Sequence, residues 1–147
     1  MTAPLHVLAV CRHGAGRSQI AAATIARDWP TGTQDVETRV AGTAPLALWR
    51  PVPAAVRLIM GEVGLTPVQQ GCRGLTPEDL TWADAVVCFA EQETWPDDLA
   101  RHPALFAFAV VDGSGRSVEF QRGMRDQVLH LVGGLLPSLA EFAGSSS

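Results

Sequence analysis

Apolar residues in this chain gather in short runs separated by segments with helical spacing. The runs at residues 5–10 (LHVLAV) and 84–90 (DAVVCFA) predict buried strands, and the run at 104–112 (ALFAFAVVD) predicts another. We expect the last two in the centre of a sheet. Residues 36–41 (VETRVA) alternate between apolar and polar side chains, which indicates a half-exposed strand at a sheet edge.

The segments between these runs predict helices. Residues 18–29 are rich in alanine, and Ser18 stands near the expected N-cap. Residues 54–64 end at a glycine, as helices often do. A short helix is expected within 76–83, with a threonine cap, a proline and two acids in its first turn. Residues 117–142 carry apolar residues at helical spacing and predict a long final helix.

The order of these elements indicates an α/β fold. Strands that alternate with helices form a parallel sheet with right-handed crossovers. The chain has no internal repeat and no linker, so we expect one domain over residues 1–143 and a disordered tail over 144–147. Pro137, together with two glycines before it, should loosen or bend the last turns of the final helix.

Composition and charge exclude several classes of protein. The 147 residues suit one domain, and the net charge of −4 leaves no basic excess for nucleic acid or a membrane surface. The N-terminus lacks the pattern of a signal peptide, and no apolar run approaches the ~20 residues of a membrane span. Three cysteines cannot all pair and fit no zinc pattern, which favours a reduced, cytoplasmic protein. No metal or organic cofactor is implied.

The stretch VCRHGAGRSQ directly follows the first strand and carries the candidate chemistry. A loop that enters a helix N-terminus directs backbone N–H groups at one point and forms an anion site. Gly14 and Gly16 allow positive φ and close approach to a ligand, and Arg17 can hold two oxygens of an oxyanion. The same positive field favours the nucleophilic thiolate of Cys11. A structural glycine turn around a buried thiol is the alternative.

In these residues the chain resembles the low-molecular-weight protein tyrosine phosphatase superfamily, which includes one class of arsenate reductases. The segment VLAVCRHGAGRSQIAAA resembles its first strand, its C-x₅-R-S loop and its first helix. VAGT (40–43), LTPEDLTWADAVVCFA (75–90) and VVDGSG (110–115) resemble further family motifs. The resemblance implies a three-layer fold with a four-stranded parallel sheet, order 2-1-3-4, and helices on both faces.

The resemblance also implies roles for residues. Cys11 would attack phosphorus, Ser18 would hydrogen-bond the thiolate, and Asp112 would be the general acid and then the base. Trp49 is a candidate for the pocket mouth. The side chains of Arg12 and His13 are expected to face outward, because the loop offers its backbone to the anion. The expected oxyanion-binding residues are Arg12, His13, Gly14, Ala15, Gly16, Arg17 and Ser18.

Some positions depart from the family pattern. Gly14 stands where the family has an asparagine, so side-chain hydrogen bonds that hold the loop are lost. Gly113 replaces the proline after the acid, which suggests a more mobile acid loop. The loop sequence HGAGRSQIAA is closer to the sequences of the arsenate reductases. However, Glu91 and Trp95 stand where thiol-coupled reductases carry resolving cysteines, so reduction would need an external thiol.

Three functions therefore remain open from the sequence. The first is a cysteine-dependent phosphatase acting on a phosphorylated protein or a small phosphomonoester, with phosphotyrosine among the candidates. The second is an arsenate reductase that uses an external thiol. The third is a non-catalytic oxyanion-binding or regulatory protein. Cys11, Arg17 and Asp112 are the residues on which both catalytic hypotheses depend.

Overall fold

A computed structural model describes residues 3–30, 32, 34–44 and 50–145, and its centre is a four-stranded parallel sheet. The strands are β2 (Val36–Gly42), β1 (Leu5–Cys11), β5 (Ala85–Cys88) and β6 (Leu105–Ala107), in that spatial order. This order corresponds to the predicted 2-1-3-4 when the main strands are counted along the chain. The half-polar β2 lies at one edge, as its alternating pattern predicts.

The last strand differs from the expectation. Only three residues of the apolar run 104–112 form β6, and β6 lies at the other edge of the sheet instead of its centre. The N–H of Phe108 still bonds to the carbonyl of Cys88 at 2.9 Å, after which the chain leaves the sheet and leads to Asp112. A separate antiparallel pair, β3 (Arg50–Pro51) and β4 (Gly71–Cys72), was not predicted.

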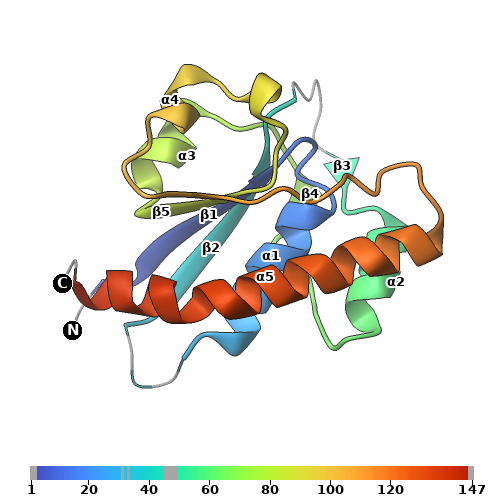
Figure 1. Ribbon diagram of the computed structural model, residues 1–147, viewed down its shortest axis with the longest axis horizontal. Coiled ribbons are helices and arrows are strands. Elements are labelled where there is room, and N and C mark those ends of the chain that lie inside the picture. The colour runs from blue at the N-terminus through green and yellow to red at the C-terminus, as the bar shows by residue number, and fades with distance from the viewer. Residues whose placement is uncertain (1–2, 31, 33, 45–49, 146–147) are drawn as a thin grey trace.

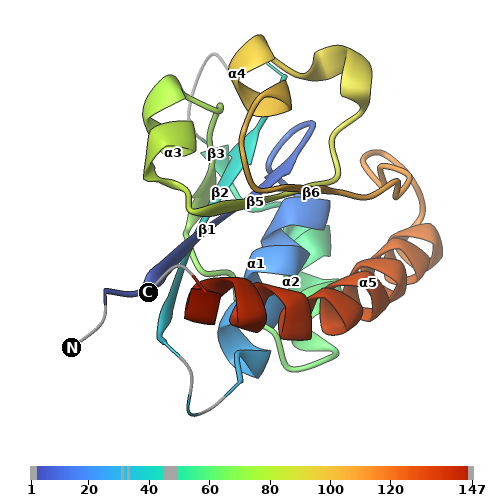
Figure 2. The same ribbon diagram turned by 60° about the vertical axis from the view of Figure 1, so that its left-hand side comes forward.

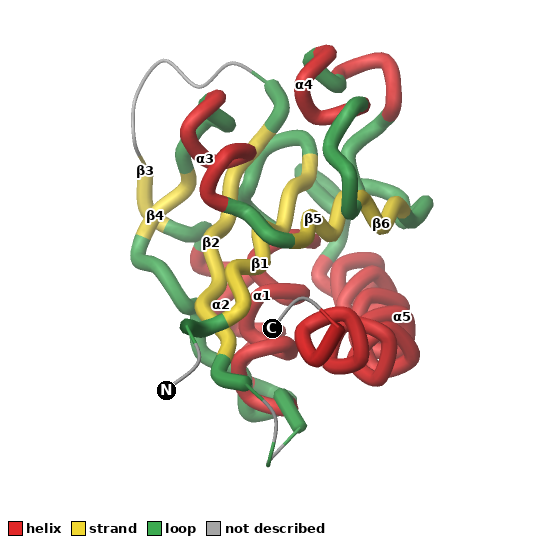
Figure 3. The backbone as a smooth tube through the Cα atoms, turned by 90° about the vertical axis from the view of Figure 1, so that its left-hand side faces the viewer, coloured by secondary structure: helices red, strands yellow, loops and turns green. Residues whose placement is uncertain are grey.

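The helices lie in two groups on the two sides of the main sheet (Figures 1, 2 and 3). One group consists of α1 (Arg17–Asp28), α2 (Ala54–Gly61) and α5 (Val118–Ser145). The other consists of α3 (Pro77–Trp82), the 3₁₀ turn η1 (Gln92–Thr94) and α4 (Asp97–Ala100). Within the described residues, no helix is long and apolar enough to cross a membrane.

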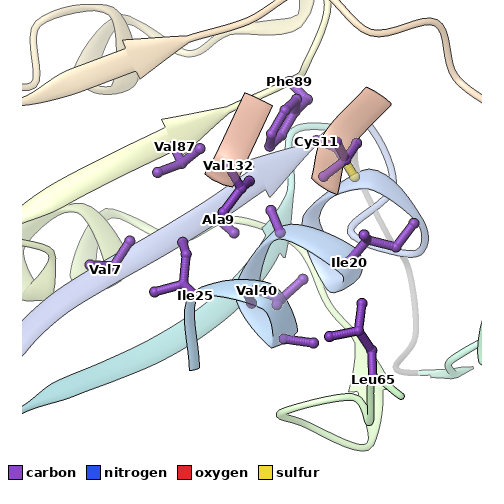
Figure 4. Close-up of a cluster of buried hydrophobic side chains, with 14 of the residues drawn as sticks. Val7, Ala9, Cys11, Ile20, Ile25, Val40, Leu65, Val87, Phe89 and Val132 are labelled. Atoms are coloured by element: carbon purple, nitrogen blue, oxygen red, sulfur yellow. The ribbon is translucent and has the colours of Figure 1, made fainter. Parts of the chain in front are cut away.

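Side chains of β1 alternate between two apolar clusters. Val7, Ala9 and Cys11 join the larger cluster, which includes residues of α1 and α5 (Figure 4). Leu8 and Val10 join the smaller cluster, which includes residues of α3 and α4. Because β1 is buried on both faces, its sequence is a continuous apolar run. The alternation places the Cys11 side chain on the face of the sheet that α1 covers.

The final helix, α5, continues through Pro137 to Ser145. An internal proline removes one hydrogen bond and crowds the preceding turn, but burial of an apolar face can outweigh that cost. Around Pro137 the helix buries Leu135, Leu136 and Leu139. The helix therefore takes in Gly144 and Ser145, the first two residues of the expected tail, and residues 146–147 lie outside the described part.

Candidate active site

Three polar side chains that follow three different strands meet at one edge of the sheet. Cys11 ends β1, Glu91 comes three residues after β5, and Asp112 follows the extended segment after β6. The carboxyl ends of parallel strands share an edge, and ligand sites of open α/β sheets lie there. The loop of residues 12–16 crosses this edge and leads into α1.

The loop needs a glycine for its conformation at one position rather than two. Gly14 has φ +66°, in the left-handed region that favours glycine. Gly16 has φ −126°, and a Cβ there would lie 3.5 Å from Met124 Cε, which is ordinary contact, so the expectation of positive φ at Gly16 was wrong. Within the described structure, the N–H groups of residues 12–16 donate to no other backbone carbonyl. These donors are available to a ligand.

Gly42, at the end of β2, supports the loop from beneath. A Cβ at this position would lie 2.6 Å from the carbonyl carbon of His13 and 2.9 Å from the carbonyl oxygen of Arg12. The next residue, Thr43, donates its N–H to the carbonyl of Cys11 at 2.9 Å. The VAGT segment therefore packs its backbone directly on the backbone of the loop, which only glycine permits at position 42.

The thiol of Cys11 is almost fully buried and is hydrogen-bonded to Ser18. The distance between Cys11 Sγ and Ser18 Oγ is 3.0 Å, as the resemblance implies. Ser18 does not cap the helix, because Gly16 occupies the N-cap position and no side chain caps it. The serine hydroxyl is thus free to act on the sulfur, where it can donate to a thiolate.

Arg17, the first residue of α1, is also buried, and its guanidinium group is held on several sides. Nη1 donates to the carbonyls of Phe89 and Val110, both at 2.7 Å. Nη1 and Nη2 donate to the two carboxylate oxygens of Glu91 at 2.9 and 3.3 Å. Nη2 also lies 3.9 Å from Asp112 Oδ2. The guanidinium plane is therefore fixed before any ligand binds.

The charges of this pair stabilise each other. Burial lowers the pKa of Arg17, but the hydrogen bond to Glu91 and the nearby acidic groups raise it further, so the net shift is upward. Burial raises the pKa of Glu91, but hydrogen bonds and the Arg17 charge outweigh burial and hold that pKa below its ordinary value. Both groups are ionised at neutral pH, and Arg17 remains a permanent cation in the site.

One nitrogen of Arg17 has no hydrogen-bond partner among the described residues. This nitrogen, Nε, is buried. A buried N–H of a charged group without a partner is costly, so a site that keeps one is built to receive an acceptor. An oxyanion beside Cys11 would supply that acceptor.

Asp112 is held by its own turn. Its Oδ1 accepts the N–H of Ser114 at 2.9 Å, and the N–H of Arg116 bonds to the carbonyl of Gly113 at 3.0 Å. Gly113 is buried, and a Cβ there would lie 3.0 Å from Met124 Sδ and 3.1 Å from Gln121 Cγ. The glycine after the acid therefore lets this turn approach α5 closely.

The two side chains expected to face outward behave differently. Arg12 is exposed, as expected. His13 instead lines the cavity above Cys11, and its Nε2 lies 3.7 Å from Asp112 Oδ2. The expectation was wrong for His13 because the left-handed turn at Gly14 and the packing of His13 on Gly42 fix the direction of the backbone there.

A cavity of about 220 Å³ lies over the loop. Its floor is formed by Cys11 and the loop, one wall by the Asp112 turn, and the other walls by residues of α2 and α5. Larger hollows elsewhere do not include Cys11. Trp49, the candidate for the pocket mouth, lies outside the described residues. The described His, Cys, Asp and Glu side chains form no group that could hold a metal ion.

The other two cysteines are buried and unpaired. Cys88 lies in β5 and its side chain packs in the cluster on the opposite face of the sheet. Burial raises its pKa to about 11. Cys72 is fully buried in β4, beyond β2 from β1, and burial raises its pKa as well. None of the three cysteines forms a disulfide.

Comparisons with known proteins agree with this geometry at the level of the fold. No protein-family model and no curated protein matches the chain. Solved structures do match. The YwlE arginine phosphatase from Geobacillus stearothermophilus is 22% identical, with a TM-score of 0.75 over 92% of this chain and 93% of that chain. A low-molecular-weight phosphotyrosine phosphatase from Vibrio cholerae O395 is 23% identical, with a TM-score of 0.76 over 92% and 96%.

The chain has the fold of the low-molecular-weight protein tyrosine phosphatases. Arsenate reductases share it: a thioredoxin-dependent arsenate reductase from Corynebacterium glutamicum is 22% identical, with a TM-score of 0.66 over 93% of this chain and 64% of that chain. The predicted α/β fold with a four-stranded parallel sheet and its strand order are thereby confirmed. Identities this low establish the fold and leave the activity to the residues of the site.

Two residues of the site within this phosphatase fold were not assigned a role from the sequence. Glu91 holds Arg17, and the signal for it was a charged residue just beyond a buried strand, at the same sheet edge as Cys11. Gln19 is fully buried and donates to the carbonyl of Gly14 at 2.9 Å. Its amide holds the loop at Gly14, a residue with no side chain of its own to do so.

Proposed function

We propose that the protein is a cysteine-dependent phosphatase that hydrolyses phosphomonoesters, with phosphotyrosine among the candidate substrates. The observation that carries the proposal is the unpartnered, buried Nε of Arg17 beside a thiol that is hydrogen-bonded to Ser18. An oxyanion held by that Nε and the free N–H groups of the loop would lie directly over Cys11 Sγ. Thiolate nucleophiles need a reducing compartment, so we propose the cytoplasm as its location.

In the first step, the Cys11 thiolate attacks the phosphorus atom. The S–P bond forms while the bond from phosphorus to the leaving oxygen breaks. Asp112 gives its proton to that oxygen, and the alcohol departs neutral. Arg17 and the loop N–H groups hold the three non-bridging oxygens, where charge gathers in the transition state. The expected oxyanion-binding set, residues 12–18, acts in this step.

In the second step, water attacks the cysteinyl phosphate. Asp112, now a carboxylate, takes a proton from the water as the new O–P bond forms. The S–P bond breaks, and Cys11 leaves as a thiolate that the Ser18 hydroxyl stabilises. The cycle returns every group to its starting charge and requires no metal ion or organic cofactor.

Arsenate reduction with an external thiol is the second candidate. Arsenate has the shape and charge of phosphate, and Cys11 would attack it in the same way. The observation that bears on it is the position of Cys88 on the opposite face of the sheet, with a pKa of about 11. Cys88 is therefore a poor resolving thiol, and in this candidate reaction an external thiol displaces arsenite from Cys11 and is oxidised in the process.

The experiment that separates these functions compares the wild type with Cys11→Ser on two reactions. One is hydrolysis of aryl phosphates, and the other is arsenate turnover with added thiols. The proposal predicts hydrolysis that Cys11→Ser abolishes. Thiol-dependent arsenate turnover without hydrolysis would establish the second candidate instead. Binding of phosphate with neither activity would leave the non-catalytic oxyanion-binding function.

A further inference from the structure

Among the described residues that line the Cys11 cavity, three carry ionisable side chains: Cys11, His13 and Asp112. Two of these side chains have roles in the proposed reaction, whereas His13 contributes only its backbone N–H and its side chain has no role. The Nε2 atom of His13 lies 3.7 Å from Asp112 Oδ2, and both side chains are about one-third exposed. Asp112 must be protonated to act as the general acid. A histidine this close to its carboxylate can change the fraction of Asp112 that is protonated.

The two oxygens of Asp112 have different surroundings. Oδ1 accepts the N–H of Ser114 at 2.9 Å, so it is occupied. Oδ2 faces His13 at 3.7 Å and Arg17 Nη2 at 3.9 Å. This arrangement favours Oδ2, the oxygen next to the histidine, as the one that carries the proton of the acid form.

We propose that His13 is a positioning residue that controls the protonation of Asp112, an inference that rests on the proposed phosphatase reaction. When His13 Nε2 moves about 1 Å closer to Asp112 Oδ2, a neutral imidazole can accept a hydrogen bond from protonated Oδ2 and so stabilises the acid form of Asp112. An imidazolium instead donates to the carboxylate and holds Asp112 in its ionised form, which has no proton to give.

The two arrangements contain the same number of protons. A neutral histidine with a protonated aspartate and an imidazolium with a carboxylate differ only in which atom holds the shared proton. Acidifying the solution through the range in which histidines titrate thus adds both forms in a fixed ratio, and below that range neither form increases further. The reactive fraction stops rising until a second proton binds.

The remaining charged groups around Asp112 do not change in this range. Arg17, at the start of α1, remains a cation paired with Glu91. Helix α5 presents Gln121 and Met124 to the Asp112 turn, and neither side chain titrates. The ionisation state of Cys11 affects the attack on both substrates equally. Its effect therefore cancels in the ratio of their kcat/KM values.

The test measures kcat/KM for an aryl phosphate with a poor leaving group and one with a good leaving group, between about pH 5 and 8. Only the poor leaving group needs the Asp112 proton. The kcat/KM for the poor leaving group divided by that for the good one therefore reports the fraction of protonated Asp112. In the wild type the ratio should rise as pH falls and then level off once His13 is an imidazolium. In His13→Gln it should keep rising and exceed the wild-type ratio about tenfold at about pH 5.5.

Two further variants complete the design. His13→Lys places a permanent cation beside Asp112 and should lower the ratio at neutral pH. His130→Gln makes the same chemical change as His13→Gln at an exposed histidine of α5, outside this cavity, and should leave the profile unchanged. If His13→Gln does not fold, His13→Asn serves for the same comparison.

An identical pH profile of the ratio in the wild type and His13→Gln would overturn the role of His13. Equal losses on both substrates with an unchanged ratio would also overturn it, because they indicate a purely structural effect. Absence of hydrolysis by the wild type would overturn the proposed function together with this inference, whereas hydrolysis with an unchanged ratio overturns only this inference.

Discussion

The guanidinium group of Arg17 donates to both carboxylate oxygens of Glu91, at 2.9 and 3.3 Å, across the carboxyl ends of β1 and β5. These bonds use Nη1 and Nη2 and leave Nε unpartnered within the described structure. A rigid, pre-oriented arginine stabilises a transition state without reorganising during the reaction. Glu91 therefore helps to set the direction in which the unpartnered Nε of Arg17 points.

Replacing Glu91 by glutamine should lower activity without unfolding the protein. The amide keeps the size of the side chain but removes the charge that holds Arg17, so the guanidinium loses its fixed orientation. We expect kcat/KM on aryl phosphates to fall about ten- to a hundredfold. Glu93→Gln, a matched change at an exposed residue in η1, should leave activity unchanged. Equal activities of the two variants would contradict a role for Glu91.

Alanine at Gly42 should disturb the loop. Its Cβ would lie 2.6 Å from the His13 carbonyl carbon, a contact that only a backbone shift can relieve. We expect a large loss of activity and a lower melting temperature. Gly133→Ala is the matched control, because nothing lies within 4 Å of its Cβ and it is inside α5, where alanine adds about 0.5–1 kcal/mol of stability. A fully active Gly42→Ala would show that the loop does not depend on this contact.

The acid role of Asp112 predicts a dependence on the leaving group. Asp112→Asn cannot protonate the departing oxygen, so hydrolysis of esters with poor leaving groups should fall about 10²–10⁴-fold. Good leaving groups depart as anions without a proton from Asp112. Their esters should therefore show a much smaller loss in the rate of the bond-breaking step. Single-turnover rates on both substrates measure this directly. Equal losses on the two substrates would remove the assignment.

Asp79 should govern stability rather than activity. It is buried, accepts two hydrogen bonds from Arg73 at 2.7 Å each, and caps α3 through Thr76. Burial raises the pKa of Asp79, but the bonds from Arg73 and Thr76 outweigh it and hold the pKa below its ordinary value. Asp79→Asn should lower the free energy of unfolding by about 2 kcal/mol at neutral pH.

The sign of the pH dependence follows from that lowered pKa. The ionised Asp79 contributes its full stability above its unfolded pKa of about 3.9, and this contribution is lost as pH falls through the lower native value. The difference between the wild type and Asp79→Asn should therefore shrink at strongly acidic pH. Urea unfolding at neutral and acidic pH measures it, with the exposed Asp98→Asn as a control that should change little. A difference that grew on acidification would contradict this account.

Local signals in the sequence were enough for most of the fold. The buried run before Cys11 and the alternating residues of β2 predict the two strands and their places, because burial on two faces or one leaves a clear pattern. The apolar run 104–112 was misleading. It continues past β6 because Phe108 packs against the core and the Val110 carbonyl accepts from Arg17, although neither residue belongs to the sheet.

Only those parts of the candidate site that lie within one continuous segment could be predicted from the sequence. Cys11, Arg17 and Ser18 belong to one continuous stretch, and their spacing indicates their chemistry. The pairing of Arg17 with Glu91 joins residues 74 positions apart, and the approach of His13 to Asp112 depends on how two loops pack. Such contacts follow from the register of strands and the geometry of turns, which no local pattern specifies.

The most direct test of the phosphatase mechanism is to trap its covalent intermediate. Wild type mixed with an aryl phosphate and quenched rapidly in acid should carry one phosphoryl group, which peptide mass spectrometry should locate on Cys11. Cys11→Ala should carry none and release no phosphate. Hydrolysis by Cys11→Ala, or turnover by the wild type with phosphate never found on Cys11, would contradict the mechanism.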